Sequence, residues 1–277
     1  MTTPTNRQRY TRRAVIGTLA AATVGAPVLL SQMAEAAPGP KAAGTPLWHP
    51  VPSTDGLKAY EGLEFDRANL FPSRHSDYIY VEDGDHYRFN IWRDDRDSTG
   101  GGDRQRTEAK GMVQNGTALK MVNGETWNIS YEMYMPSTLH GTSKFTHIFQ
   151  TKIPSTNAGP FVTLDLTRES STSETLRARA YANSGSPTIA STPLGPLRNT
   201  WVTIRWTLTI GSSGSARFVC VNSAGKTVAD GTMHGVNIPD QGDYVRPKWG
   251  IYRSVESASA DIVDTHILFR DYQASRA

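Results

Sequence analysis

The sequence predicts an all-β domain, a jelly-roll (concanavalin-like) antiparallel β-sandwich. Short segments rich in valine, isoleucine, threonine and aromatic residues recur about every 8–15 residues after the N-terminal region. Beyond that region, no stretch of a dozen residues keeps the apolar period of a helix, which argues against a parallel α/β fold. About thirteen such strands in one domain fit two packed sheets.

A hairpin is the clearest local signal. Asp83-Gly84-Asp85 separates two expected strands, 78–81 and 86–92. An Asp-Gly pair between two alternating segments favours a tight hairpin turn. The other expected strands are 105–112, 117–122, 126–135, 144–152, 161–168, 175–182, 201–210, 215–221, 226–230, 247–254 and 261–270.

Residues 1–36 are interpreted as a twin-arginine-type signal peptide. Arg12 and Arg13 precede an apolar run over 14–30, and Ala34-Glu35-Ala36 has the small-x-small form of a cleavage site. The alternative is an N-terminal membrane anchor, but the run is short and contains glycine and proline. We therefore expect a secreted, extracellular protein exported by the twin-arginine route. A Pro/Gly-rich linker over 37–56 and a single domain over 57–277 are expected to follow.

The net charge of +3 comes from this leader. Residues 1–36 hold four arginines and one acid, and the rest of the chain is balanced. The charge therefore supports neither a nucleic-acid partner nor, after cleavage, a membrane surface. The single cysteine, Cys220, excludes an intrachain disulfide and is expected to be a buried structural thiol. Nothing in the sequence indicates an oligomer, and we expect a monomer.

Three expected strands carry polar residues at every second position. Alternate residues of a strand share a face. One strand alone also fits a solvated outer face, but three together predict one shared polar cleft. Gly250 lies within such a strand, and a missing side chain there often lets a ligand approach the backbone. The three sets are Arg104, Arg106, Glu108 and Lys110; Thr146, Ile148, Gln150 and Lys152; and Arg246, Lys248, Gly250 and Tyr252.

The same strands carry a family resemblance. Jelly-roll alginate lyases show the motifs Arg-Thr-Glu-Leu-Arg, Gln-Ile-His and Tyr-Phe-Lys-Ala-Gly-Val-Tyr in that order. This chain has Arg106-Thr107-Glu108-Ala109-Lys110, Gln150-Thr151-Lys152 and Arg246-Pro247-Lys248-Trp249-Gly250-Ile251-Tyr252. Over about residues 60–272 it resembles the jelly-roll polysaccharide lyases. These include glucuronan lyases, heparin-lyase-I-like enzymes and related secreted, cellulose-induced fungal proteins.

The resemblance implies a secreted polysaccharide lyase that cleaves a uronic-acid-containing polymer by β-elimination. Such an enzyme removes the C5 proton, which is alpha to a carboxylate, and expels the C4 oxygen. Donors must neutralise the carboxylate, and Arg106 and Gln150 match the family's neutralising positions. Tyr252 matches the family's tyrosine, which protonates the leaving oxygen and is also a candidate to take the C5 proton. The expected substrate-binding residues are Arg104, Glu108, Lys110, Arg246 and Lys248.

The sequence departs from the family at one catalytic position. The family's histidine, two residues after the glutamine, is Lys152 here. His147 is nearby, but alternation puts it on the opposite face with Phe145 and Phe149, which favours a core or edge histidine. A bulge before Gln150 would reverse that. Three alternatives remain open: Lys152 binds the carboxylate or acts as base, His147 is a displaced base, or catalysis is lost.

Two other function classes compete with the lyase. A non-catalytic carbohydrate-binding sandwich would follow from lost catalysis. A glycoside hydrolase needs paired carboxylates, and Asp165 has no acidic partner on its strand at the required spacing. We expect no required cofactor. Structural calcium is the candidate ion, since loops 82–85 and 94–97 are rich in carboxylates, although solvated turns explain them as well. The choice of polyuronate depends on loops such as 93–104 and 183–199, which no motif interprets.

Overall fold

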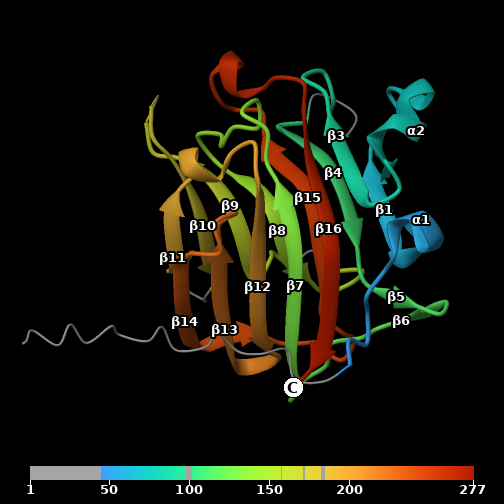
Figure 1. Cartoon of the computed structure of the whole chain (residues 1–277), viewed down its shortest axis with the longest axis vertical. Helices are drawn as coiled ribbons and strands as arrows, with labels where there is room; N and C mark the ends of the chain where they lie inside the picture. Colours follow the sequence, from blue (N-terminus) through green and yellow to red (C-terminus); the bar gives the residue numbers. More distant parts are fainter. Residues whose placement is uncertain (1–44, 98–101, 157, 171, 182–184) are drawn as a thin grey trace, which may run out of the picture. The chain divides into compact units, whose positions relative to one another are not determined.

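The computed structural model describes residues 45–97, 102–156, 158–170, 172–181 and 185–277. Two seven-stranded antiparallel sheets form a β-sandwich, which confirms the predicted fold class (Figure 1). The first sheet runs in the order β1-β4-β15-β8-β9-β10-β11. Its strands are β1 (Gly62–Phe65), β4 (Arg104–Lys110), β15 (Arg246–Ser254), β8 (Thr146–Lys152), β9 (Val162–Arg168), β10 (Glu174–Ala180) and β11 (Thr188–Pro193).

The second sheet packs against the first and closes the core. Its order is β14-β13-β12-β7-β16-β3-β2. The strands are β14 (Thr227–Ile238), β13 (Gly211–Val221), β12 (Trp201–Thr209), β7 (Thr126–Tyr134), β16 (Thr265–Arg276), β3 (His86–Ile91) and β2 (Ile79–Glu82). A separate two-stranded ribbon joins β5 (Val113–Gln114) and β6 (Thr117–Ala118).

Strand β7 shows why these segments form half-buried strands. Trp127, Ile129, Tyr131 and Met133 are buried, and the intervening residues are partly exposed. This period-two pattern places one apolar face on the core and one polar face outward. The same alternation continues in β12, its neighbour in the sheet.

Helices are few and short in the described part of the chain. None is long and apolar enough to cross a membrane. They are α1 (Pro52–Asp55), η1 (Gly56–Ala59), η2 (Pro72–Arg74), α2 (His75–Tyr78), η3 (Gly195–Leu197) and η4 (Ser259–Asp261).

Most expected strands are observed, with shifted ends. The predicted hairpin turns through Asp83-Gly84-Asp85, which joins β2 to β3. Strands β1 and β11 were not expected. Both lie at edges of the first sheet, and β11 (Thr-Ile-Ala-Ser-Thr-Pro) lacks the apolar alternation that a half-buried strand shows. Cys220 is buried, as expected, and burial raises the pKa of its thiol to about 12.

Part of the expected linker is attached to the sandwich. Trp48 is fully buried, and its backbone N–H donates to the carbonyl of Ala274 at 3.1 Å. Its ring stacks on Trp249 with centroids 5.3 Å apart. From Trp48 onward the segment predicted as a linker is therefore packed on the domain, because the Trp48 indole and backbone complete the core. The predicted signal peptide over 1–36 and the linker residues 37–44 lie outside the described residues.

Candidate functional site

The three motif strands are adjacent in the first sheet, in the order β4-β15-β8. The side chains that point away from the core from these strands and from β1, β9 and β10 are called the polar face here. Every candidate site residue from the sequence belongs to it. The members on which the site depends are Glu64, Arg104, Arg106, Glu108, Lys110, His147, Gln150, Lys152, Asp165, Arg179, Arg246, Lys248 and Tyr252.

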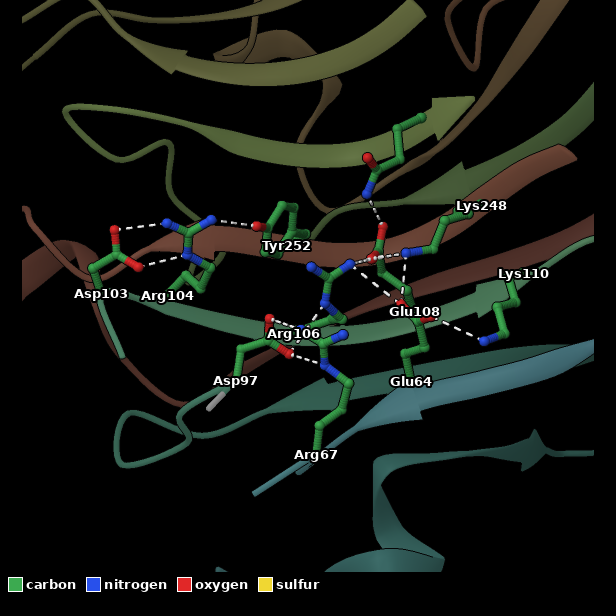
Figure 2. Close-up of polar contacts among 11 residues, drawn as sticks. Glu64, Arg67, Asp97, Asp103, Arg104, Arg106, Glu108, Lys110, Lys248 and Tyr252 are labelled. Carbon is green, nitrogen blue, oxygen red and sulfur yellow. Dashed lines mark hydrogen bonds and ion pairs between the residues drawn. The ribbon is translucent and has the colours of Figure 1, made fainter. Parts of the chain in front are cut away.

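Glu108 is the centre of the largest cluster on this face (Figure 2). Its carboxylate accepts hydrogen bonds from Arg106 Nη1 at 2.5 Å, Gln150 Nε2 at 2.5 Å and Lys248 Nζ at 2.6 Å. The Glu108 side chain is 2% exposed. Burial raises the pKa of Glu108, but Lys248 and Arg106 outweigh it and hold the pKa below its usual value. The two donors that the family resemblance assigns to the substrate carboxylate therefore already bind a carboxylate of the chain.

Two further acids complete this cluster. Glu64 on β1 accepts from Lys248 Nζ at 2.7 Å and from Lys110 Nζ at 2.9 Å. Asp97, in the loop before β4, accepts from Arg106 Nε at 3.1 Å and from Arg67 Nη2 at 2.5 Å. Burial raises the pKa of Glu64, but the neighbouring Lys248 ammonium and its hydrogen bond lower it far below the usual range. Opposite charges therefore hold the buried cations of this cluster in place.

Tyr252 lies beside this cluster, between two arginines. Arg104 Nη1 donates to the phenol oxygen at 2.8 Å, and Asp103 fixes the same guanidinium at 2.5 Å (Figure 2). The guanidinium of Arg106 lies over the ring, 3.8 Å from its centroid. On the other side the ring contacts Phe145, with centroids 5.0 Å apart. The hydroxyl is thus positioned by a cation, and the ring by packing.

His147 also lies beside Tyr252. Their ring centroids are 5.8 Å apart, and the two residues are register partners on β8 and β15. His147 Nδ1 lies 2.6 Å from Asp165 Oδ1, and both residues are buried. Asp165 also lies 3.2 Å from Arg179 Nε. A carboxylate on Nδ1 selects the tautomer that leaves the Nε2 lone pair free to accept a proton.

The alternation prediction for β8 is wrong. The register with β9 shifts between His147 and Phe149, so Ile148 has no partner on β9. This extra residue is a β-bulge, which turns His147 to the polar face together with Gln150. Ile148, which alternation placed on the polar face, is buried in the core cluster. Thr146, also expected on the polar face, is fully buried and lies 3.0 Å from the backbone nitrogen of Thr142.

The prediction for Gly250 also needs correction. Its φ of +136° lies in a region that side chains rarely adopt. A Cβ there would lie 2.1 Å from the carbonyl oxygen of Thr107 and 2.8 Å from Glu108 Cα. The missing side chain therefore admits the backbone of the neighbouring strand β4 rather than a ligand.

Lys152 lies at the opposite end of β8 from His147. It pairs in register with Arg246, whereas Tyr252 pairs with His147, five residues earlier on β8. The structure therefore separates the family's histidine position from the tyrosine. Arg246 binds Glu61 at 3.0 Å.

The acid-rich loops hold cations of the chain itself. Asp94 binds Arg74 at 2.8 Å, and Glu82 binds Arg88 at 3.0 Å. In the described part of the chain, no group of three or more His, Cys, Asp or Glu side chains is arranged to hold a metal ion. The candidate calcium sites therefore stay an expectation without a supporting arrangement.

Sequence reasoning missed four acids that shape the site: Glu64, Asp97, Asp103 and Asp165. Asp165 carried a usable signal. It interrupts the apolar run Val162 to Leu166, and a carboxylate in a buried strand requires a partner. The other three lie on an unexpected strand or in a loop.

Comparisons with solved structures agree with this fold. A family 7 alginate lyase in complex with substrate is 16% identical, covers 82% of this chain and 97% of its own, and superposes with a TM-score of 0.57. An alginate lyase from Pseudomonas aeruginosa is 14% identical over 80% and 99% of the two chains, with a TM-score of 0.53. One from Klebsiella pneumoniae is 11% identical over 72% and 84%, also at 0.53. No protein-family model and no curated protein sequence matches the chain. The chain therefore has the jelly-roll fold of polysaccharide lyases.

Proposed function

We propose that this protein is a polysaccharide lyase that cleaves a uronic-acid-containing polysaccharide by β-elimination. The observation that carries the proposal is the group formed by Tyr252, His147 and Asp165. A phenol and an imidazole lie side by side on an arginine-lined face, and a buried carboxylate orients the imidazole. A proton donor and a proton acceptor at one point are what an elimination requires.

The roles follow from the hydrogen bonds. His147 takes the C5 proton on Nε2, because Asp165 engages Nδ1. Tyr252 donates its phenol proton to the C4 oxygen as the C4–O4 bond breaks. Arg104 donates to the phenol oxygen and is partly exposed, so it is the cation best placed to neutralise the substrate carboxylate. Arg106 and Gln150 are positioning residues rather than direct substrate contacts, because both bind Glu108.

A hydrolase fits this face less well. Retaining and inverting glycosidases need one carboxyl group whose pKa is raised so that it can donate a proton. Glu64 and Glu108 are the acid pair to consider on this face, because both bind Lys248 Nζ. Their pKa values are both lowered, although burial opposes this, because the lysine ammonium outweighs it.

The substrate class in this proposal is a polyuronate. The neighbours in the fold comparison are named as alginate lyases, so alginate is the first polymer to test. Export by the twin-arginine route, a monomeric state and independence of any cofactor are parts of the same proposal. A non-catalytic carbohydrate-binding sandwich is the alternative, and it uses the same face without turnover.

The test is ultraviolet absorbance. β-Elimination leaves a conjugated, unsaturated uronate at the new chain end, and hydrolysis does not. The mature protein is mixed with alginate, glucuronan, heparin-type chains and pectate, beside a Tyr252→Phe control. A rise in absorbance with one polymer, lost in the control, is expected. Binding without absorbance on any polyuronate overturns the lyase in favour of the binding module. New reducing ends without absorbance indicate a hydrolase.

A further inference from the structure

One cation of the polar face differs from the others. Lys152 is half-buried and has no hydrogen bond or ion pair with any of the described residues. Every other lysine or arginine of the polar face has a carboxylate within ion-pair distance. These pairs are Arg104 with Asp103, Arg106 with Glu108, Lys110 with Glu64, Arg179 with Asp165, Arg246 with Glu61, and Lys248 with Glu108.

The surroundings of Lys152 are positive. Arg246 is its register partner on β15. Burial lowers the pKa of Lys152, the nearby Lys248 and Arg106 lower it further, and Glu108 and Glu64 offset this only in part. An ammonium that is partly removed from water beside other cations gains most from an added anion.

We propose that Lys152, with Arg246 beside it, forms a carboxylate-binding subsite for a polyuronate chain, away from the bond that breaks. The substrate class rests on the function proposed above. Lys152 lies five positions after His147 on β8, which corresponds to about 15 Å along the strand. The subsite therefore contacts a sugar remote from the reacting one, and it selects polymers that carry acid groups on several sugars.

This position predicts a particular kinetic effect. A contact far from the reacting atoms stabilises the bound substrate and the transition state equally, so its loss raises KM and leaves kcat unchanged. A base or an acid at the reaction centre would instead lower kcat. The same contact contributes to the salt dependence of binding, because salt screens charge pairs that are partly exposed.

The experiment compares Lys152→Met with Lys226→Met. Met keeps most of the apolar stem and deletes the charge. Lys226 is exposed in the turn between β13 and β14, on the other sheet, so it controls for net charge. Calorimetry measures polyuronate binding in the Tyr252→Phe background, where substrate is not consumed, at low and high salt. Turnover is measured with Tyr252 intact.

Lys152→Met is expected to weaken polyuronate binding about five- to tenfold, to reduce its salt dependence and to raise KM by a similar factor at constant kcat. Lys226→Met is expected to bind as the parent does. Equal binding by the two variants overturns the subsite, and so does a fall in kcat at unchanged KM. If no polyuronate is cleaved but Lys152→Met still weakens binding, the lyase fails and the subsite stands.

Discussion

Tyr252→Phe is the sharpest test of the proposed chemistry. The substitution deletes one hydroxyl and keeps the ring. The ring contacts should therefore survive, namely Phe145 at 5.0 Å, His147 at 5.8 Å and the Arg106 guanidinium at 3.8 Å, all measured to ring centroids. If the phenol is the proton donor to the leaving oxygen, its removal costs about 10²–10⁴ in kcat.

Tyr252→Phe is expected to lower the free energy of unfolding only slightly. The lost hydrogen bond comes from Arg104, whose side chain is 40% exposed and is still held by Asp103 at 2.5 Å. Water replaces the phenol as its partner, so no buried donor is left unsatisfied. We expect a loss of about 1 kcal/mol or less, and a fall in Tm of no more than about 4 °C for a domain of this size.

The assay is the initial rate of ultraviolet absorbance on the polymer that the wild-type protein cleaves, with Tm from calorimetry and binding measured separately. A loss of kcat with nearly intact binding and Tm is expected. Wild-type kcat in Tyr252→Phe would refute the reasoning. Activity lost together with Tm would mean that the hydroxyl acts in folding.

Three further predictions concern the groups around this tyrosine and the opposite sheet. Asp165→Asn is expected to lower kcat and to change the pH dependence of kcat, because the carboxylate fixes the tautomer and the orientation of the His147 ring. Glu108→Gln is expected to destabilise the fold by about 3–5 kcal/mol at neutral pH, because buried cations lose their anion. The pKa of Glu108 is lowered in the fold, so this stabilisation is present above about pH 4.5 and is lost as the pH falls through the lowered pKa. Burial and Arg88 lower the pKa of His266 to about 4. As the pH falls from 6.5 to 4, His266 is therefore protonated in the unfolded chain but not in the folded one, and the free energy of unfolding decreases.

Each of these has a contrary outcome. An Asp165→Asn protein with an unchanged pH profile would remove the carboxylate from the mechanism. A Glu108→Gln protein that unfolds at the wild-type denaturant midpoint would mean that the buried cluster adds no stability. For the third, His266→Gln keeps an acceptor for Arg88 and should flatten the acid limb of stability between pH 6.5 and 4. If the His266→Gln protein loses stability between pH 6.5 and 4 as the wild-type protein does, other groups cause that loss.

Much of the fold could be predicted because its signal is local. Alternation in segments such as 126–135 and 201–210 depends only on which side chains must leave water, and both segments form strands. The edge strands β1 and β11 could not be predicted this way. They form strands because their backbones pair with a neighbouring strand, β4 for β1 and β10 for β11, and their sequences show no strong apolar alternation.

The candidate site divides along the same line. The sequence by itself determined that Arg106 and Glu108 share one face of their strand, and that Lys248 and Tyr252 share one face of theirs, because side chains alternate along a regular strand. Only the tertiary structure decided which side chains meet.

The clearest case is His147. The bulge at Ile148 arises from pairing with β9, and it brings the imidazole to Tyr252 and Asp165 against the alternation of its own strand. Likewise, the pairing of strands decides the partner of Gln150, because its amide meets Glu108 of β4. Face is a property of one strand, whereas register and the contacts between strands depend on two segments far apart in sequence, and no single-strand pattern contains them.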